Sequence, residues 1–170
     1  MWAAQDHQYQ ISRLQPSRAS LMVWGAISSI GTLHLLCVDE SITAESYVNM
    51  LEVDFFDNLD YDLPDDFIWM HDNAPAHHAR HTQEFLENKG IKVLEWPAHS
   101  PDLNPIENVW GILSKKLYQN GKTYENTTDL WEAVCREWRQ ISGETIRHLY
   151  NSIPCRMCDI LQANGQRIKY

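Results

Sequence analysis

The chain has 170 residues, of which 44% are hydrophobic and 22% are charged, and its net charge at pH 7 is −9. This length predicts one domain with a substantial core. The acidic charge excludes a domain that holds nucleic acid by its own charge alone. No apolar stretch approaches the roughly 20 residues that span a bilayer, so we expect no membrane partner. The N-terminus lacks a signal-peptide pattern, and the four cysteines are therefore expected to be reduced thiols.

The first half of the chain predicts a polar arm, a hairpin and a helix. Residues 1–19 are polar and are expected to form an irregular N-terminal arm. Apolar runs at 21–27 and 32–38, separated by a short turn, predict a β-hairpin. Thr43 is a good helix N-cap, and apolar residues recur every four positions after it. This spacing predicts an amphipathic helix over 44–59.

The second half alternates strands and helices and then becomes helical. Short apolar runs predict strands at 67–70 and 91–95, with a helix at about 78–89 between them that Gly90 ends in a left-handed conformation. Asn104 and Pro105 suit the cap and first position of another helix. The last predicted helices span about 128–140, 142–152 and 154–164. This order predicts a layered α/β fold that opens with an antiparallel hairpin.

Two acidic residues stand where a strand ends and where a helix begins. Asp72 follows the strand at 67–70, and Glu107 lies in the first turn of the helix capped by Asn104, with 34 residues between the two carboxylates. Cleavage of a phosphodiester in line is promoted by two divalent ions roughly 4 Å apart. Mg²⁺ prefers carboxylates, water and phosphate oxygens as ligands. We therefore predict that Asp72 and Glu107 are catalytic metal ligands whose carboxylates face one cleft, roughly 4–8 Å apart without metal.

Each of these residues also has a structural interpretation. Asn104 and Glu107 fit the capping-box pattern, and Asp72 fits an aspartate that turns the chain after a strand. A cluster of histidines suggests zinc, but we favour cleft or surface roles for them; its members are His71, His77, His78 and His81. Cys155 and Cys158 have the spacing of redox and zinc motifs, yet no second ligand pair accompanies them, and we predict that they pack structurally.

Two longer sequence blocks carry a family resemblance. Residues 72–77 (DNAPAH) and 96–111 (WPAHSPDLNPIENVWG) resemble the catalytic domain of mariner-superfamily cut-and-paste transposases. The 34-residue gap is similar to that of the Tc-type branch, as are residues 23–25, 43–47 and 164–170. The resemblance covers about residues 20–170, so we expect this range to be the catalytic domain.

The resemblance implies a fold, a chemistry and partners. The fold is expected to be α/β, a ribonuclease-H-like mixed sheet flanked by helices, with a helical C-terminal part. Asp72 would be the second and Glu107 the third of three carboxylates that bind two Mg²⁺ or Mn²⁺ ions for DNA cleavage and strand transfer. Asn73, His77, Asn104 and Asn108 are expected to line the cleft. The implied partners are transposon ends, target DNA and a second copy of the chain, and the implied location is the nucleus.

The same resemblance places the first strand and the first carboxylate before residue 20, where this sequence does not show them. Asp39 imitates that motif but follows Trp24 instead of preceding it, so we interpret it as coincidence. We therefore expect weak metal binding and no activity from the chain as it stands, with residues 8–11 as the internal segment most suited to replace the strand. The alternative is a domesticated relic that binds DNA or protein without catalysis. A free-standing ribonuclease-H-like nuclease has no support in the sequence.

Overall fold

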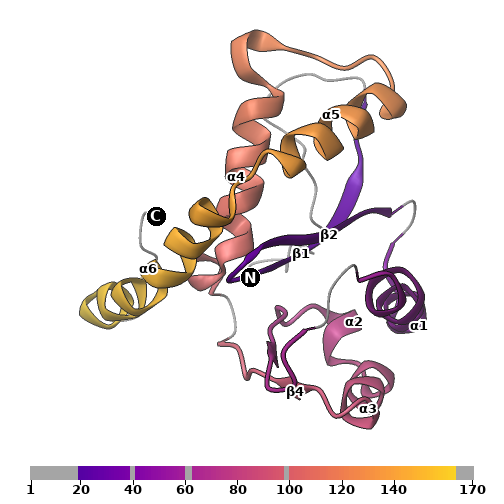
Figure 1. The fold of residues 1–170 in the computed structure, drawn as a ribbon, viewed down its shortest axis with the longest axis vertical. Helices are drawn as coiled ribbons and strands as arrows, with labels where there is room; N and C mark the ends of the chain where they lie inside the picture. Colours follow the sequence, from indigo (N-terminus) through magenta and orange to yellow (C-terminus); the bar gives the residue numbers. More distant parts are fainter. Residues whose placement is uncertain (1–18, 39–40, 60–62, 98–99, 164–170) are drawn as a thin grey trace, which may run out of the picture. The chain divides into compact units, whose positions relative to one another are not determined.

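The computed structural model describes residues 19–38, 41–59, 63–97 and 100–163 (Figure 1). The predicted arm, apart from Ala19, and the proposed replacement strand at 8–11 lie outside these ranges. The described residues form two compact units, the central unit (41–100) and the hairpin–helix unit (19–38 and 101–163). Within the described ranges, no helix is both long and apolar enough to cross a membrane.

The hairpin–helix unit begins with the predicted hairpin. Strands β1 (Met22–Ser28) and β2 (Gly31–Val38) pair antiparallel, and the register shifts by one residue between Ala26 and Ile27. Successive side chains of a strand point to opposite faces. Val23 and Trp24 are consecutive and both buried, so β1 is covered on both faces at these positions.

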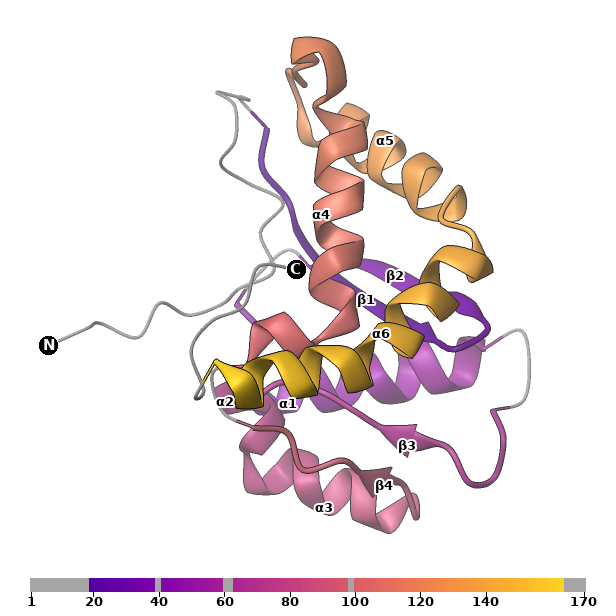
Figure 2. The same ribbon diagram turned by 90° about the vertical axis from the view of Figure 1, so that its left-hand side faces the viewer.

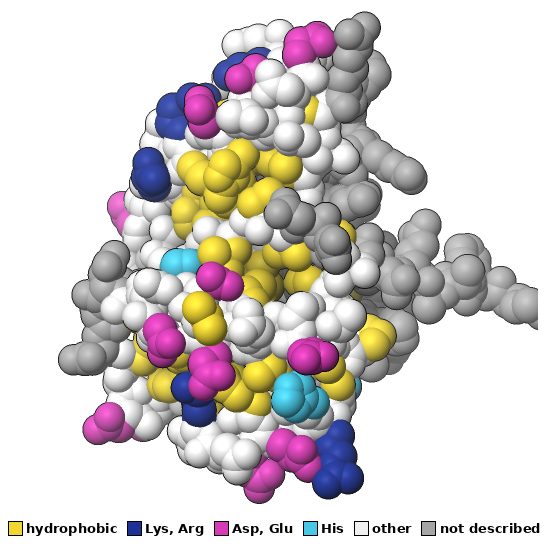
Figure 3. All heavy atoms as spheres, turned by 90° about the vertical axis from the view of Figure 1, so that its right-hand side faces the viewer, with side chains coloured by type: hydrophobic (Ala, Val, Ile, Leu, Met, Phe, Trp, Pro, Cys, Tyr) yellow, Lys and Arg dark blue, Asp and Glu magenta, His cyan; other side chains and the backbone are white. Residues whose placement is uncertain are grey.

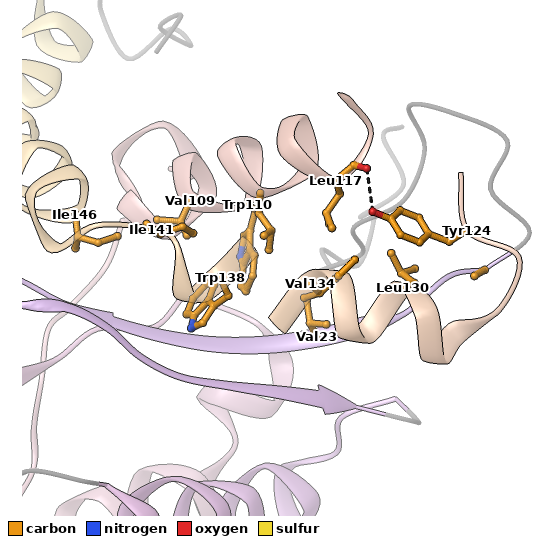
Figure 4. Close-up of a cluster of buried hydrophobic side chains, with 13 residues drawn as sticks. Val23, Val109, Trp110, Leu117, Tyr124, Leu130, Val134, Trp138, Ile141 and Ile146 are labelled. Carbon is orange, nitrogen blue, oxygen red and sulfur yellow. Dashed lines mark hydrogen bonds between the residues drawn. The ribbon is translucent and has the colours of Figure 1, made fainter. Parts of the chain in front are cut away.

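Three helices cover the hairpin and complete the core of this unit: α4 (Pro105–Leu117), α5 (Thr127–Arg139) and α6 (Gly143–Gln162). Figure 4 shows their apolar side chains meeting those of β1; the fully buried ones include Val23, Val109, Leu113, Leu130, Val134 and Ile146. The Tyr124 hydroxyl donates a hydrogen bond of 3.0 Å to the Leu117 carbonyl and so ties the segment before α5 to the end of α4 (Figure 4).

Helix α6 corrects one prediction. The sequence predicted separate helices at 142–152 and 154–164, because proline removes a backbone N–H and disfavours a helix interior. The structure instead shows one helix with Pro154 inside it. The second half stays helical because it is anchored by tertiary contacts: the Arg156 side chain bonds to groups at the start of α4 and just before it. Helical structure in proteins is stabilised mainly by such packing.

In the central unit, the predicted helix over 44–59 is present but is not a regular α-helix. It consists of α1 (Ala44–Asn49), the π-helical η1 (Met50–Phe55) and a short 3₁₀ turn (Phe56–Asn58). Thr43 caps α1 as predicted, accepting a 3.1 Å bond from the Ser46 N–H. An exact spacing of four exceeds the 3.6 residues of an α-helical turn, so the wider π turns keep the apolar stripe on one side. Its buried members are Tyr47, Leu51 and Phe55.

The remaining central elements follow the predicted order with shorter strands. Strands β3 (Ile68–Trp69) and β4 (Lys92–Val93) pair in parallel. The predicted helix at 78–89 starts earlier and is interrupted at Ala79, giving α2 (Pro75–His78) and α3 (Arg80–Asn88). Gly90 has φ of 71°, which confirms the predicted left-handed end. The described strands thus form two separate two-stranded sheets, the antiparallel hairpin and this parallel pair.

Candidate active site

Asp72 lies in the loop between β3 and α2, and its carboxylate is held by two groups of that loop. Its Oδ1 accepts a 3.1 Å hydrogen bond from the Ala74 N–H, which is the turn-forming contact that the sequence suggested. Oδ1 also lies 2.7 Å from Nδ1 of His77. The same nitrogen lies 3.2 Å from the Asp72 carbonyl oxygen. Since both neighbours are acceptors, Nδ1 of His77 carries the hydrogen and donates.

The His77 ring is fixed by aromatic neighbours. His77 is buried, with 5% of its surface exposed. Its ring centroid lies 4.3 Å from that of Tyr47 on α1, and 4.8 Å from that of His71, with which it stacks at an interplanar angle of 3°. A ring held on two sides cannot turn away from its partner. The packing therefore fixes the direction in which His77 supports the Asp72 carboxylate.

His71 is neutral in this stack, and this gives a prediction about pH. Burial lowers the pKa of His71 from 6.5 to about 4, with a further lowering by His77 and His78 that Asp72 partly opposes. Its Nδ1 accepts a 3.3 Å bond from the indole N–H of Trp69, which also requires an unprotonated nitrogen. Because the unfolded chain binds this proton at higher pH than the folded chain, protonation favours unfolding as pH falls from 6.5 towards 4.

We expect the imidazole NMR signals of His71 to titrate with a midpoint near 4. The free energy of unfolding of the central unit should fall between pH 6.5 and 4, and His71→Gln should reduce that slope. A midpoint near the ordinary value of 6.5 would show that the ring is solvated and that the stack is not formed.

Asn73 joins two loops of the central unit. Its side-chain N–H donates to the Trp96 carbonyl at 3.2 Å, and its Oδ1 lies 2.8 Å from Nε2 of His78. The first bond spans 23 residues and ties the loop after β3 to the loop after β4. Asn73 thereby holds the Asp72 loop in place, and its expected place in the lining of the cleft stays a prediction.

Glu107 lies in the first turn of α4, as predicted, and the helix start is built by the residues before it. Asn104 is buried and its Oδ1 accepts a 3.3 Å bond from the Ile106 N–H, while its carbonyl accepts one of 3.2 Å from the Glu107 N–H. Pro105 occupies the first helical position. Glu107 is half-buried, whereas Val109 on the same helix is fully buried.

A buried arginine that was not predicted from the sequence lies beside this helix start. The Arg156 side chain on α6 has 0% exposure. Its Nη1 donates to the Asp102 carbonyl at 3.1 Å and to Oδ1 of Asn108 at 2.6 Å, and its Nε donates to the Ser152 hydroxyl at 2.9 Å. A signal was present: apolar residues at 146, 149, 153 and 160 form a helical stripe in which position 156 is a core position.

The orientation of α6 also contradicts the prediction that the two nearby cysteines pack in the interior. Cys155 and Cys158 are exposed instead of packed. Because Arg156 points inward, its neighbours on the helix point outward. Among the described residues, no group of three or more His, Cys, Asp or Glu side chains is arranged to hold a metal ion.

The structure thus groups the predicted site residues by unit. It brings Asp72, Asn73 and His77 together in the central unit, and Asn104, Glu107 and Asn108 together in the hairpin–helix unit. The approach of the Asp72 and Glu107 carboxylates to each other stays a prediction.

Curated relatives with similar sequences are transposases. The Tc3 transposase of Caenorhabditis elegans is 34% identical over 159 residues, which cover 94% of this chain and 48% of the relative. The Tc1 transposase of the same organism is 28% identical over 163 residues, which cover 96% of this chain and 59% of the relative. The chain therefore spans about half the length of these relatives.

Solved structures with a similar fold include the catalytic domain of Mos1 mariner transposase, with a TM-score of 0.74, 18% identity and coverage of 92% of this chain and 79% of that one. A structure of that domain with Raltegravir and Mn has the same TM-score and covers 90% and 80% of the two chains at 18% identity. The Mos1 Strand Transfer Complex matches with a TM-score of 0.77 at 23% identity, covering 93% of this chain and 47% of that one. These likenesses confirm the ribonuclease-H-like fold.

The family match is broad and joins the two sequence blocks of the site. It covers residues 1–130, and so includes both Asp72 and Glu107. Together with the Tc3 and Mos1 likenesses, it shows that the chain belongs to the DDE superfamily endonucleases, as a Tc1/mariner-type transposase catalytic domain.

Proposed function

We propose that the chain provides the catalytic core of a Tc-type DNA transposase, which cleaves strands at the ends of a transposable element and joins the freed 3′ hydroxyls to target DNA. The observation that carries this proposal is that local contacts hold two carboxylate residues, Asp72 and Glu107, in a member of this family. Asp72 is oriented by His77 and the Ala74 N–H, and Glu107 stands in a helix turn formed by Asn104.

The donor atoms of these two residues fit a hard divalent cation. Carboxylate oxygens are preferred by Mg²⁺ and Mn²⁺, whereas soft thiolates are not. Asp72 and Glu107 would hold the ions, which would supply activation of the attacking oxygen and neutralisation of phosphate charge. His77 keeps one carboxylate oxygen of Asp72 engaged, so that this side chain is oriented before metal arrives.

DNA is the partner that this chemistry requires, although the chain itself is acidic. In Figure 3, Asp and Glu side chains are spread among hydrophobic and neutral ones on the face drawn, and Lys and Arg form no continuous strip there. With a net charge of −9, phosphate binding needs divalent cations at the site and basic surfaces elsewhere in a longer protein. We infer that element ends and target DNA are bound in that setting, by two copies of the protein, in the nucleus.

The 170 residues supply two of the three carboxylates that the family resemblance requires, and we propose that they do not cleave DNA by themselves. The alternative candidate is a relic that keeps the fold and binds DNA or protein without catalysis. An experiment with a hybrid protein distinguishes the catalytic function from the non-catalytic one.

In the hybrid, the segment of the Tc3 transposase that matches this chain is replaced by this chain, and cleavage of DNA carrying the element ends is measured with Mn²⁺. We expect cleavage by the hybrid and by the unmodified Tc3 transposase, and none by the isolated chain. A hybrid that folds and binds the element ends without cutting them would favour the non-catalytic relic. Cleavage by the isolated chain, lost in its Asp72→Asn variant, would show that another carboxylate completes the site.

A further inference from the structure

We propose that Arg156 is a positioning residue that holds the first turn of α4 in place and thereby sets the affinity of the Glu107 carboxylate for a divalent cation. This inference rests on the proposed function. Arg156 lies on the last helix, beyond residues 1–130 that match the family.

The bonds of Arg156 enclose the turn that carries Glu107. Asp102, whose carbonyl accepts from Nη1 at 3.1 Å, precedes the helix cap, and Asn108, whose Oδ1 accepts at 2.6 Å, directly follows Glu107. One guanidinium nitrogen is therefore bonded on both sides of the turn. Figure 2 shows α6 running past the first turns of α4, where these bonds form.

The guanidinium suits this role better than any other side chain. It is planar and presents its donors in a rigid fork, so bonds made by its Nη1 and Nε fix each other's direction. The Ser152 hydroxyl holds Nε at 2.9 Å and so anchors the fork to α6 itself. A fully buried charge costs much free energy unless it is hydrogen-bonded. Moving the acceptors away from the Arg156 guanidinium would therefore be unfavourable.

The position of Glu107 should depend on these hydrogen bonds of Arg156. A metal site gains affinity when its ligands are already oriented, and loss of a supporting contact typically lowers metal affinity by about 10–100-fold. Without the bond to Asn108, the first turn of α4 would keep its Asn104 cap but lose this side-chain bond to α6. Glu107 would then sample positions away from the cation, although the helix remains formed.

The test measures Mn²⁺ binding to the full chain by electron paramagnetic resonance of the free ion. Glu107→Gln should weaken binding, and Arg156→Met should weaken it by about 10-fold. Arg156→Lys, which keeps the charge but not the fork, should lose part of the affinity. Arg147→Met, an exposed arginine on the same helix, is the matched control and should have no effect.

Dependence on Glu107 distinguishes positioning from a general structural role. In the Glu107→Gln background, Arg156→Met should cause no further loss of Mn²⁺ affinity. If Arg156→Met does not fold, Asn108→Leu removes the same bond and should also weaken binding, whereas Asn108→Asp keeps an acceptor and should retain it.

Two results would overturn the inference and leave the proposed function intact. One is a folded Arg156→Met variant with unchanged affinity while Glu107→Gln weakens binding. The other is an equal loss from Arg156→Met with and without Glu107. If Glu107→Gln itself leaves Mn²⁺ binding unchanged, the proposed metal site is wrong and the inference fails with it.

Discussion

Asp72→Asn should abolish strand cleavage by the hybrid transposase described above. The substitution keeps the size of the side chain and an oxygen for the Ala74 and His77 contacts, but it removes the negative charge that would hold a cation. Metal ions supply several kcal/mol of charge stabilisation in such reactions, which corresponds to a rate loss on the order of 10³-fold. The measurement is the initial rate of cleavage of end-labelled DNA with Mg²⁺ or Mn²⁺.

Asp66→Asn is the control for this substitution. Asp66 is exposed and lies in the turn before β3, so its loss changes the net charge by the same amount without touching the site. We expect it to cleave at the unmodified rate. Equal rates for Asp72→Asn and the unmodified hybrid would show that Asp72 is only the turn residue of its loop.

Gly25→Ala should destabilise the hairpin–helix unit, because this glycine faces two tryptophans. A Cβ atom at position 25 would lie 2.7 Å from the Trp110 ring and 2.9 Å from the Trp138 ring. These rings stack on each other, with centroids 5.4 Å apart, and both are buried. Neither can give way without disturbing the core, so we expect a loss of about 1–3 kcal/mol in the free energy of unfolding.

Gly111→Ala is the matched comparison, and we expect it to raise the free energy of unfolding. A Cβ there meets nothing within 4 Å, and the residue lies inside α4, where alanine is favoured over glycine by about 1 kcal/mol. Urea unfolding of the three proteins should therefore rank them with Gly111→Ala most stable and Gly25→Ala least. A Gly25→Ala variant as stable as the unmodified chain would show that the tryptophan pair does not pack against β1 as described.

Local signals explain why much of the fold was predictable from the sequence. The hairpin, the Thr43 cap, the left-handed Gly90 and the start of α4 at Asn104 each depend on residues close in sequence. Caps and turns are satisfied by their own neighbours, so residue types alone indicate them. The same holds for Asp72 and Glu107, whose places at a strand end and a helix start follow from local pattern.

Features that depend on tertiary contacts could not be predicted in this way. The helix continues through Pro154 because contacts 48 and 54 residues away, at Asn108 and Asp102, hold its second half. The pairing of His77 with Asp72 needs the ring to be clamped by Tyr47 from another helix. The exposure of Cys155 follows from the inward direction of Arg156, which only the packing of α6 decides.

Our central proposal is that Asp72 and Glu107 are ligands of the same divalent-metal site, and bound Mn²⁺ can test it. Crystals of the chain soaked in Mn²⁺ should give an anomalous difference peak bonded at about 2 Å to carboxylate oxygens of both residues, or two peaks roughly 4 Å apart with one residue on each. Bound Mn²⁺ found only at other side chains, with these two carboxylates too far apart to share a pair of ions, would contradict the claim.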